Sequence, residues 1–504
     1  MEEKMKLNGS AKFGYALGAV GKDMVYMLSA SYILYYYQDL LGIAGTVMGA
    51  IMMGARVFDA FNDPIMGVIV AKTKTRWGKF RPWLFIGTVL NAIILVIVFT
   101  APPSLSGSSL AVYAAVFYIL WGVTYTMMDI PFWSMIPAFT KGGREREGLT
   151  SLARSCAGVG SALITIITMI VVPMLGGMSL PDVKASADEI SAQLNDSAAL
   201  SEGQAADLAG QLTSLTNRME ISGFSKFAIV IAILFVVFIV ITCVTIKEKS
   251  SVDMESPSVG QMFKALVSND QAMTVVVTIV LVNTSLYITS NLLIYFFKYD
   301  MGGADWNGTY VLFNAFGGGM QIISMMIFYP ISRKFLSVSK VCYMSFAFAI
   351  CGYAVLLGMM MAGIKNLYIL FIPGFFVFVA FGLLTVLTTV FLANTVDYGE
   401  LLNNRRDESV IFSMQTFVVK LASGIAVFIT GIALDVFNIS GDTTDTAAAA
   451  SAVSSSNLMG LRLTMTVLPI IGMLIALFVF FKKFILTEEK MDEINAELVQ
   501  RRGE

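Results

Sequence analysis

Apolar stretches separated by short polar segments follow one another along nearly the whole chain, from about residue 11 to about residue 485. Each stretch holds about 20 residues or more, which is enough for a helix to cross a hydrocarbon core of about 30 Å. The pattern predicts an all-α protein with twelve membrane-spanning helices, near residues 11–38, 43–71, 81–101, 108–139, 147–177, 223–246, 271–298, 308–333, 338–362, 366–398, 408–436 and 460–485.

The connections between these helices alternate in charge. The connection between the second and third helices, KTKTRWGKFR, carries five Lys and Arg residues and no acid, and those after the fourth, sixth, eighth and tenth helices are basic or mixed. The alternate connections, such as APPSLSGSS, nearly lack Lys and Arg. Because Lys and Arg concentrate in short cytoplasmic loops, both termini are predicted to be cytoplasmic.

The chain divides into two pseudo-symmetric halves of six predicted helices. Corresponding segments resemble one another, RWGKFRPW with SRKFLSVSK and PAFTKGGRERE with VDYGELLNNRRDE. This duplication is the pattern of the major facilitator fold, in which the substrate site lies near the midplane where the halves meet. The predicted domains are an N-terminal half (1–246), a cytoplasmic linker (247–270), a C-terminal half (271–486) and a cytoplasmic tail (487–504).

Two external segments are unusually long, 178–222 and 437–459. In the first, SADE and SEGQ each place Glu or Gln three residues after Ser, which is typical of a helix start. We therefore expect two short external helices there. The second, rich in Ser, Thr, Ala and Asp, is expected to be a loop.

Composition agrees with a polytopic membrane protein and excludes several classes of function. The 504 residues are 56% hydrophobic and 14% charged, with a mean hydropathy of +0.74, whereas soluble domains are about one quarter charged. There is no basic patch for nucleic acid, and no nucleophile–base arrangement or nucleotide loop that would indicate an enzyme. The four cysteines have no metal-type spacing. Histidine is absent, so any proton coupling would use carboxylates.

A polar stripe interrupts the second predicted helix, in the segment RVFDAFNDP. Arg56, Asp59, Asn62 and Asp63 lie within about 120° of one another at 100° per residue. Ionisable residues within a membrane are costly and therefore indicate a functional site. With the hydroxyl of Thr126 from the fourth predicted helix, two carboxylates and an amide supply the oxygen ligands that a hard monovalent cation prefers.

A second group of polar and aromatic residues occupies the fourth and fifth predicted helices. Tyr125, Asp129 and Trp133 recur at intervals of four residues on one helical face. A sugar donates hydroxyl hydrogens to a carboxylate and packs its apolar face on aromatic rings. Arg154 adds a forked donor for hydroxyls or for a carboxylate.

The charges of the predicted membrane region balance and lie at similar depths. A rise of about 1.5 Å per residue puts Asp23, Asp59 and Asp129 about 15–18 Å from the cytoplasmic ends of their helices, and Arg154 and Lys420 about 10–18 Å. The balanced set is Lys22, Arg56, Arg154 and Lys420 against Asp23, Asp59, Asp63 and Asp129. An alternative explanation is a set of salt bridges that only hold helices together.

Long ordered motifs across both halves resemble the glycoside–pentoside–hexuronide:cation symporter family of the major facilitator superfamily. They are GYALGAVGKDMVYM, ARVFDAFNDPIMG, RWGKFRPW, YTMMDIPFWSMIP, REREGLTSLARS, and NTVDYGE followed by SMQTFVVK. The resemblance implies that Asp59, Asn62, Asp63 and Thr126 bind the cation. The match of Asn62 favours Na⁺, with Li⁺ or H⁺ as substitutes.

The same resemblance assigns the remaining site residues. It implies sugar binding by Lys22, Asp23, Asp129, Trp133 and Arg154, with Thr416 lining the pocket. It also implies that Lys420 couples the two sites. Arg56, on the polar stripe of the second predicted helix, is expected either to balance the charge of the empty cation site or to hold two helices together. The chain departs from the family at Thr385, where an aromatic residue is expected, and at Asn394, where an acid is expected, which leaves the identity of the sugar open.

The expected function is Na⁺-coupled symport of a sugar, a glycoside such as a galactoside, by alternating access in the cell membrane. The expected partners are a small sugar, a monovalent cation and membrane lipid, with no nucleic acid, no cofactor beyond the co-transported ion, and a monomeric chain. The alternatives are a proton-coupled hexuronide or pentoside symporter, a lipid or amphiphile transporter with a more apolar cleft, and a non-transporting membrane sensor.

Overall fold

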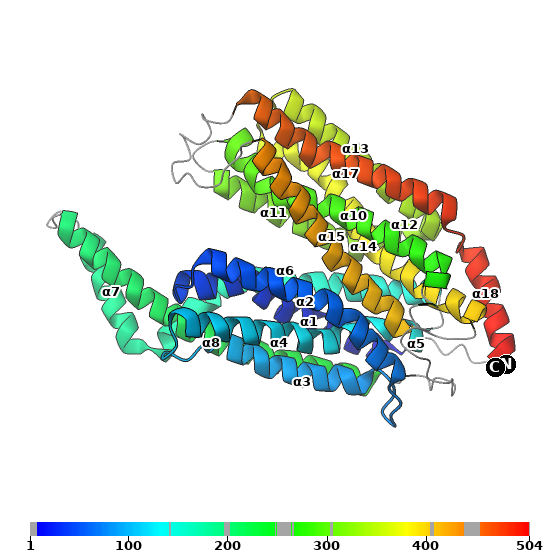
Figure 1. Ribbon diagram of the computed structural model, residues 1–504, viewed down its shortest axis with the longest axis horizontal. Coiled ribbons are helices and arrows are strands. Elements are labelled where there is room, and N and C mark those ends of the chain that lie inside the picture. Colours follow the sequence, from blue (N-terminus) through cyan, green and yellow to red (C-terminus); the bar gives the residue numbers. More distant parts are fainter. Residues whose placement is uncertain are drawn as a thin grey trace. The chain divides into compact units, whose positions relative to one another are not determined.

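The computed structural model describes residues 8–140, 143–195, 202–246, 248, 264, 267–302, 306–403, 408–437 and 454–502, and every regular element in these ranges is a helix (Figure 1). The helices are α1 (Gly9–Tyr35), η1 (Tyr36–Leu40), α2 (Gly45–Lys72), α3 (Arg81–Val98), α4 (Gly107–Ser134), α5 (Ile136–Phe139), α6 (Gly143–Ser179), α7 (Pro181–Asn195), α8 (Glu202–Thr245), α10 (Asp270–Tyr295), η3 (Phe296–Met301), α11 (Trp306–Ile323), η4 (Ser324–Phe328), α12 (Tyr329–Phe335), α13 (Val338–Met361), α14 (Leu367–Asn403), α15 (Glu408–Val436), α17 (Ser455–Lys483) and α18 (Glu488–Arg502).

Within the described residues, ten helical segments are long and apolar enough to cross a membrane. The long helices α1 and α2 are not among them, and these two carry Lys22, Asp23 and the RVFDAFNDP stripe. The count of twelve spans and the cytoplasmic position of the termini therefore stay predictions. The predicted linker and the external segment 437–459 lie mostly outside the described residues.

The chain forms two compact units, and the first comprises residues 1–62, 75–132 and 156–247. In this unit α8 is the central packing element, in contact with α1, α3 and α7. The helices α6 and α8 approach closely at Gly223, where an added Cβ would collide with the backbone carbonyl of Val172. A residue larger than glycine would therefore push these two helices apart.

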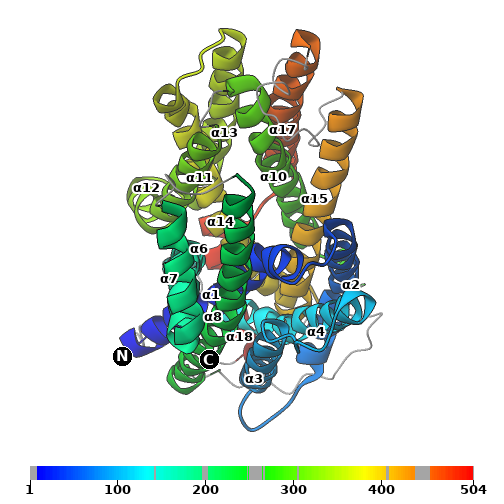
Figure 2. The same ribbon diagram turned by 90° about the vertical axis from the view of Figure 1, so that its left-hand side faces the viewer.

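The first external segment differs from the prediction of two short helices. It contains one separate helix, α7, and the N-terminal part of α8, which runs beside it (Figures 1 and 2). Because α8 continues without a break to Thr245, its first turns extend the predicted sixth helix. The motif SADE lies inside α7 and does not start it; α7 begins at Pro181, and proline is favoured in the first turn.

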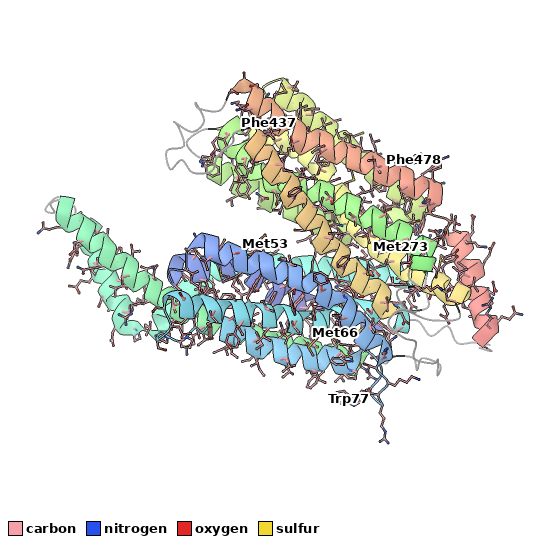
Figure 3. The ribbon with its side chains drawn as sticks, in the orientation of Figure 1. Met53, Met66, Trp77, Met273, Phe437 and Phe478 are labelled. Carbon is pink, nitrogen blue, oxygen red and sulfur yellow. The ribbon has the colours of Figure 1, made fainter. Side chains whose placement is uncertain are left out.

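The second unit comprises residues 63–74, 133–155 and 248–504. Here α10 packs on α14, α15 and α17, while α13 contacts α14 and α17. Phenylalanine rings from η3 and α11 meet in its core, including Phe297 and Phe313 at 5.5 Å between ring centres. Apolar side chains also cover the outside of the unit, as Phe478 on α17 does with 63% of its surface exposed (Figure 3), which suits a surface that faces lipid.

The predicted C-terminal tail contains the amphipathic helix α18. Met491, Ile494 and Leu498 form its buried face, and Leu486, just before the helix, belongs to the same cluster. They pack against Tyr398 and neighbouring side chains at the end of α14 and the end of α17. The tail is thus part of the second unit.

Candidate functional site

Lys22 is the centre of a buried charge cluster in the first unit. Its ammonium lies 2.8 Å from Asp129 Oδ1 and 3.2 Å from Asp23 Oδ2, and it donates to the Tyr125 hydroxyl at 3.3 Å. The structure therefore brings together three of the predicted sugar-site residues from two helices, α1 and α4. Carboxylate oxygens accept hydrogen bonds and an ammonium donates them, so the cluster offers both kinds of partner to a ligand with several hydroxyl groups.

Aromatic rings line α4 beside this cluster. Tyr118, Trp121 and Tyr125 stack along the helix with ring centres 5.9 and 5.3 Å apart, and Tyr26 of α1 lies 5.4 Å from Tyr125. Tyr125 was predicted from the sequence, whereas Tyr118 and Trp121 were not. Their spacing of three and four residues is the pattern that could have indicated a shared face. The arrangement offers an apolar wall next to charged acceptors.

Asp59 of α2 points at α4. An added Cβ on Gly122 would lie 2.5 Å from Asp59 Oδ1, so this carboxylate occupies the space that a larger residue at 122 would fill. Thr126 is buried one turn later on the same face of α4. The structure thus places Asp59 on the face of α4 that carries Thr126, and it adds Gly122, which the sequence analysis missed.

The other residues of the α2 stripe have different surroundings. Arg56 donates a hydrogen bond to Tyr26 and interacts with Asp59 and Tyr118 through its charge. Asn62 is half-buried, and within the described part of the chain its amide nitrogen donates no hydrogen bond. Pro64 follows directly inside the helix and, because it lacks an N–H, removes one bond of the helical ladder at this level.

Asp63 and Lys420 form a buried pair within the second unit. Asp63 is 0% exposed, and the Lys420 ammonium lies 3.0 Å from its Oδ1 and 2.9 Å from its Oδ2. The predicted coupling lysine therefore contacts a predicted cation ligand directly. Thr416 lies one turn earlier on α15, half-buried, with its hydroxyl directed to the carbonyl of Phe412.

Arg154 and Trp133 also meet within the second unit. The guanidinium carbon lies 3.7 Å from the centre of the Trp133 ring, a cation–π contact. Its Nε donates to Thr389 Oγ1 at 3.0 Å, a contact that the sequence analysis did not foresee. Thr385, one turn before, directs its hydroxyl to the carbonyl of Phe381 in its own helix.

A separate group of charges joins the start of α6 to α12, α14 and α18. Arg146 lies 2.7 Å from Asp397 Oδ2 and donates to Asn394 Oδ1 at 3.2 Å. Asn394 thus accepts a hydrogen bond where the resemblance leads one to expect an acid, and Asp397 supplies the negative charge. The ion pairs of the REREG segment were not predicted from the sequence.

The neighbouring carboxylate of Glu147 accepts two hydrogen bonds from the Arg333 guanidinium. The distances are 2.5 Å from Nε to Oε2 and 3.0 Å from Nη2 to Oε1. Arg333 also pairs with Glu488 of α18 at 2.5 Å. These charges lie at helix ends and hold four elements of the unit together.

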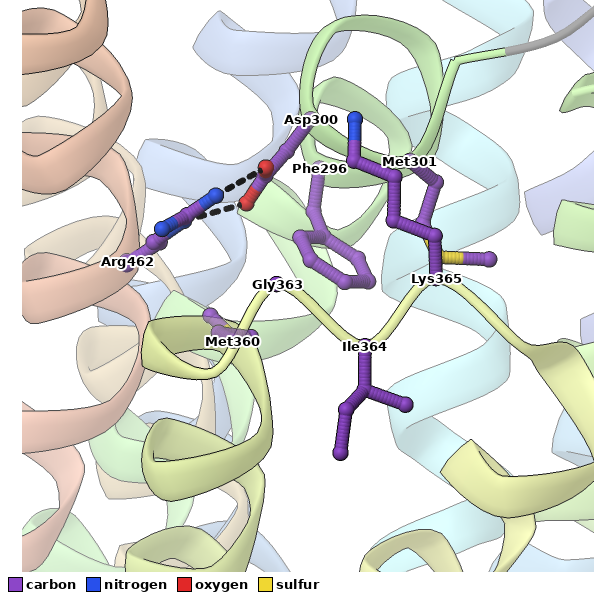
Figure 4. Close-up of a pocket in the computed structure, with 8 residues that line it drawn as sticks. All are labelled: Phe296, Asp300, Met301, Met360, Gly363, Ile364, Lys365 and Arg462. Atoms are coloured by element: carbon purple, nitrogen blue, oxygen red, sulfur yellow. Dashed lines mark hydrogen bonds and ion pairs between the residues drawn. The ribbon is translucent and has the colours of Figure 1, made fainter.

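A shallow pocket of the second unit contains a further ion pair, away from all the predicted site residues. Arg462 of α17 donates two hydrogen bonds, of 2.7 and 2.6 Å, to the carboxylate of Asp300 in η3 (Figure 4). Among the described residues there is no cluster of three or more His, Cys, Asp or Glu side chains that would hold a metal ion.

Comparison with known proteins places the chain among sugar carriers. The sequence profile of the family described as MFS/sugar transport protein matches residues 14–488. The lactose permease of Lactobacillus delbrueckii subsp. bulgaricus is 26% identical over 512 residues, which cover 99% of this chain and 74% of that protein. The raffinose carrier protein of Pediococcus pentosaceus is 27% identical over 500 residues (96% and 70%), and the isoprimeverose transporter of Lactiplantibacillus pentosus 26% over 430 residues (84% and 80%).

Solved structures share the fold at much lower identity. The proton:xylose symporter XylE bound to 6-bromo-6-deoxy-D-glucose superposes with a TM-score of 0.58 at 11% identity, covering 96% of this chain and 98% of that one. The transporter FucP in its outward conformation gives 0.59 at 12% identity, covering 93% and 97%. The fold is therefore that of the major facilitator superfamily.

Proposed function

Because the chain belongs to the MFS/sugar transport protein family, and within it to the glycoside–pentoside–hexuronide symporters, we propose that it couples Na⁺ entry to the uptake of a glycoside. The protein is a multi-pass protein of the plasma membrane and a transporter, not an enzyme. The relatives are named for lactose, raffinose and isoprimeverose, which are neutral glycosides, and lactose and raffinose are galactosides. A galactoside is therefore the first substrate to test.

The observation that carries the proposal is the pair formed by Lys420 and Asp63. Both oxygens of this buried carboxylate lie close to the Lys420 ammonium, at 2.9 and 3.0 Å, so a positive charge is held in contact with Asp63. Na⁺ carries the same charge in a smaller volume and prefers carboxylate, amide and hydroxyl oxygens. In the proposed cycle Na⁺ binds Asp59, Asn62, Asp63 and Thr126, and the Lys420 ammonium gives up its contact with Asp63.

The sugar is bound by the remaining polar residues. Asp23 and Asp129 accept its hydroxyl hydrogens, Lys22 donates to its oxygens, and the aromatic side chains support its apolar face. Trp133, Arg154 and Thr416 complete this set on the family resemblance. Release of Lys420 from Asp63 on cation binding changes the charge available to the sugar, and by linkage the sugar changes the cation affinity by the same factor. Alternating access then carries both ligands across the membrane.

A direct test uses the purified chain in proteoliposomes with radiolabelled lactose. We expect an inward Na⁺ gradient to drive accumulation, which collapses when the gradient is dissipated. Li⁺ or H⁺ gradients should drive it less. Accumulation that ignores all three gradients would overturn the symport proposal.

Arg154 beside Trp133 supports one rival, a proton-coupled hexuronide carrier, because its fork suits a carboxylate. Competition separates the two proposals. Unlabelled lactose, raffinose and isoprimeverose should reduce lactose uptake, and galacturonate should not. If galacturonate competes best, and uptake follows the proton gradient, the hexuronide carrier replaces the glycoside proposal.

A further inference from the structure

Three neighbouring threonines on α14 have different hydrogen bonds. Thr388 directs its hydroxyl to the carbonyl of Leu384 in its own helix at 2.8 Å. Thr389 also donates to its own helix, to the carbonyl of Thr385 at 3.0 Å, but it accepts a hydrogen bond from Arg154 Nε at 3.0 Å. Thr389 is 0% exposed and Arg154 is half-buried, so the contact is partly shielded from water.

The direction of the contact with Arg154 is fixed by chemistry. A hydroxyl has one proton and two lone pairs, whereas a guanidinium has donors only. The proton of Thr389 is used on the carbonyl of Thr385, so its lone pairs face Arg154. Thr389 is thus a hydrogen-bond acceptor for Arg154. Valine has nearly the same shape but could not accept this hydrogen bond.

Two contacts within the second unit help to orient the Arg154 side chain. The Trp133 ring lies 3.7 Å from the guanidinium carbon, and Thr389 accepts from Nε at the inner edge of the guanidinium plane. The ring restricts the plane of the group, and the hydroxyl restricts its rotation about the side-chain axis. The outer edge, which carries the two Nη groups, therefore has a defined direction.

We propose that Thr389 is a positioning residue that aims the Nη fork of Arg154 at a sugar hydroxyl pair. The inference rests on the proposed function, since it takes the ligand of Arg154 to be the sugar. Thr389 acts through Arg154 and touches no ligand itself. Loss of its acceptor releases Arg154 from the Trp133 ring and from its aim, while the charge of Arg154 remains.

The first test needs no substrate. Emission of Trp133 is obtained as the difference between each purified full-length protein and the same protein carrying Trp133→Phe. Arg154→Gln provides the spectrum of Trp133 without a guanidinium above it. We expect Thr389→Val to shift the Trp133 emission toward that reference, and Thr389→Ser and the control Thr388→Val to keep the wild-type spectrum. An unchanged Trp133 spectrum in Thr389→Val would overturn the proposal.

The second test is transport kinetics in proteoliposomes under a saturating Na⁺ gradient. A lost hydrogen bond to a charged group corresponds to about a tenfold rise in KM for lactose, with kcat within about twofold, because the contact serves binding. Thr389→Ser should restore the wild-type KM, and Thr388→Val should not change it. A wild-type KM in Thr389→Val, or an equal defect in Thr389→Ser, would contradict the role of the acceptor.

The two tests separate the positioning role from the proposed function. If the wild-type protein carries no glycoside, the proposed function fails, and the Trp133 emission still decides whether Thr389 holds Arg154. If lactose is carried and the Trp133 emission of Thr389→Val is unchanged, only the positioning role fails.

Discussion

Buried lysines and buried arginines are paired differently in this protein. Lys22 and Lys420 lie near the middle of α1 and α15, and each contacts carboxylates through a single ammonium. Arg146 and Arg333 lie close to helix ends, and each binds several groups through more than one nitrogen. Arg146 contacts Thr140 and α14, and Arg333 contacts α6 and α18. An ammonium is a compact charge that a cation can replace, whereas a guanidinium fork matches a fixed geometry. The comparison suggests that the lysine pairs exchange partners during transport and the arginine pairs hold the helices.

The largest effect is a loss of stability, expected when a buried arginine pair at a helix end is broken. Arg333→Met leaves Glu147 buried without its fork, and removing one member of a buried ion pair costs about 3–5 kcal/mol. The unfolding midpoint of the purified protein in detergent should fall strongly. The double variant Arg333→Met/Glu147→Gln should recover most of the loss, and Arg501→Met, at an exposed pair, should change the midpoint little. A wild-type midpoint in Arg333→Met would show that this arginine pair holds nothing.

For the buried lysine pairs, the expected effect is on Na⁺ binding. Lys420→Met removes the ammonium that competes for Asp63, so the apparent Na⁺ affinity should rise about tenfold, while gradient-driven sugar accumulation is lost. Thermal stabilisation as a function of Na⁺ concentration measures the affinity by mass action. Lys420→Arg should weaken Na⁺ binding, because a fork holds the carboxylate more firmly. Equal Na⁺ affinity in Lys420→Met and wild type would reduce Lys420 to a structural pair.

A smaller effect is expected at Gly122, where no charge changes. The methyl group of Gly122→Ala would lie 2.5 Å from Asp59 Oδ1, so the flexible carboxylate must move. The Na⁺ concentration for half-maximal uptake should rise about fivefold, with the lactose KM at saturating Na⁺ nearly unchanged. Gly54→Ala on α2 is a matched control, since its added Cβ meets nothing within 4 Å. A loss of sugar affinity alone in Gly122→Ala would mean that Asp59 belongs to the sugar site and not to the cation site.

The smallest effect is expected where the arginine network reaches the tail. Glu488 has 42% of its side chain exposed, so its pair with Arg333 is partly screened by water. Glu488→Gln should lower stability by about 1 kcal/mol or less, far below the effect of Arg333→Met. Unfolding midpoints of the two variants under identical conditions check the ranking. An equal loss in both would mean that the tail carries as much of the network as α6 does.

Most helix positions could be predicted because an apolar run of about 20 residues has few alternatives in a membrane. The helix start at SEGQ was expected, but the continuation of that helix into the predicted sixth helix was missed for a physical reason. Residues 202–222 are polar enough to indicate an external segment, yet they contain no proline, and Leu208, Leu212 and Leu215 keep the helical spacing on one face. The helix therefore continues beyond the length that the membrane requires.

Candidate site residues could be proposed where a charge lies in an apolar segment, because such a charge is costly. Asp59, Asp63, Asp129 and Lys22 were proposed in this way, and the structure buries all four. Gly122 and Thr389 could not be found, since a neutral residue acquires its role from the side chain that faces it. Arg333 was missed because charges at helix ends are common and indicate no site by themselves.

Because α8 runs without a break through both its membrane part and its external part, it is well suited to conformational measurements. Its 44 residues correspond to about 66 Å, of which about 30 Å lies in hydrocarbon. A tilt of about 10° in the membrane part would displace the far end of the remaining arm by about 6 Å. The helix α7 packs against this part of α8 (Figure 1). A probe attached there would magnify rearrangements that are too small to follow at the buried residues themselves.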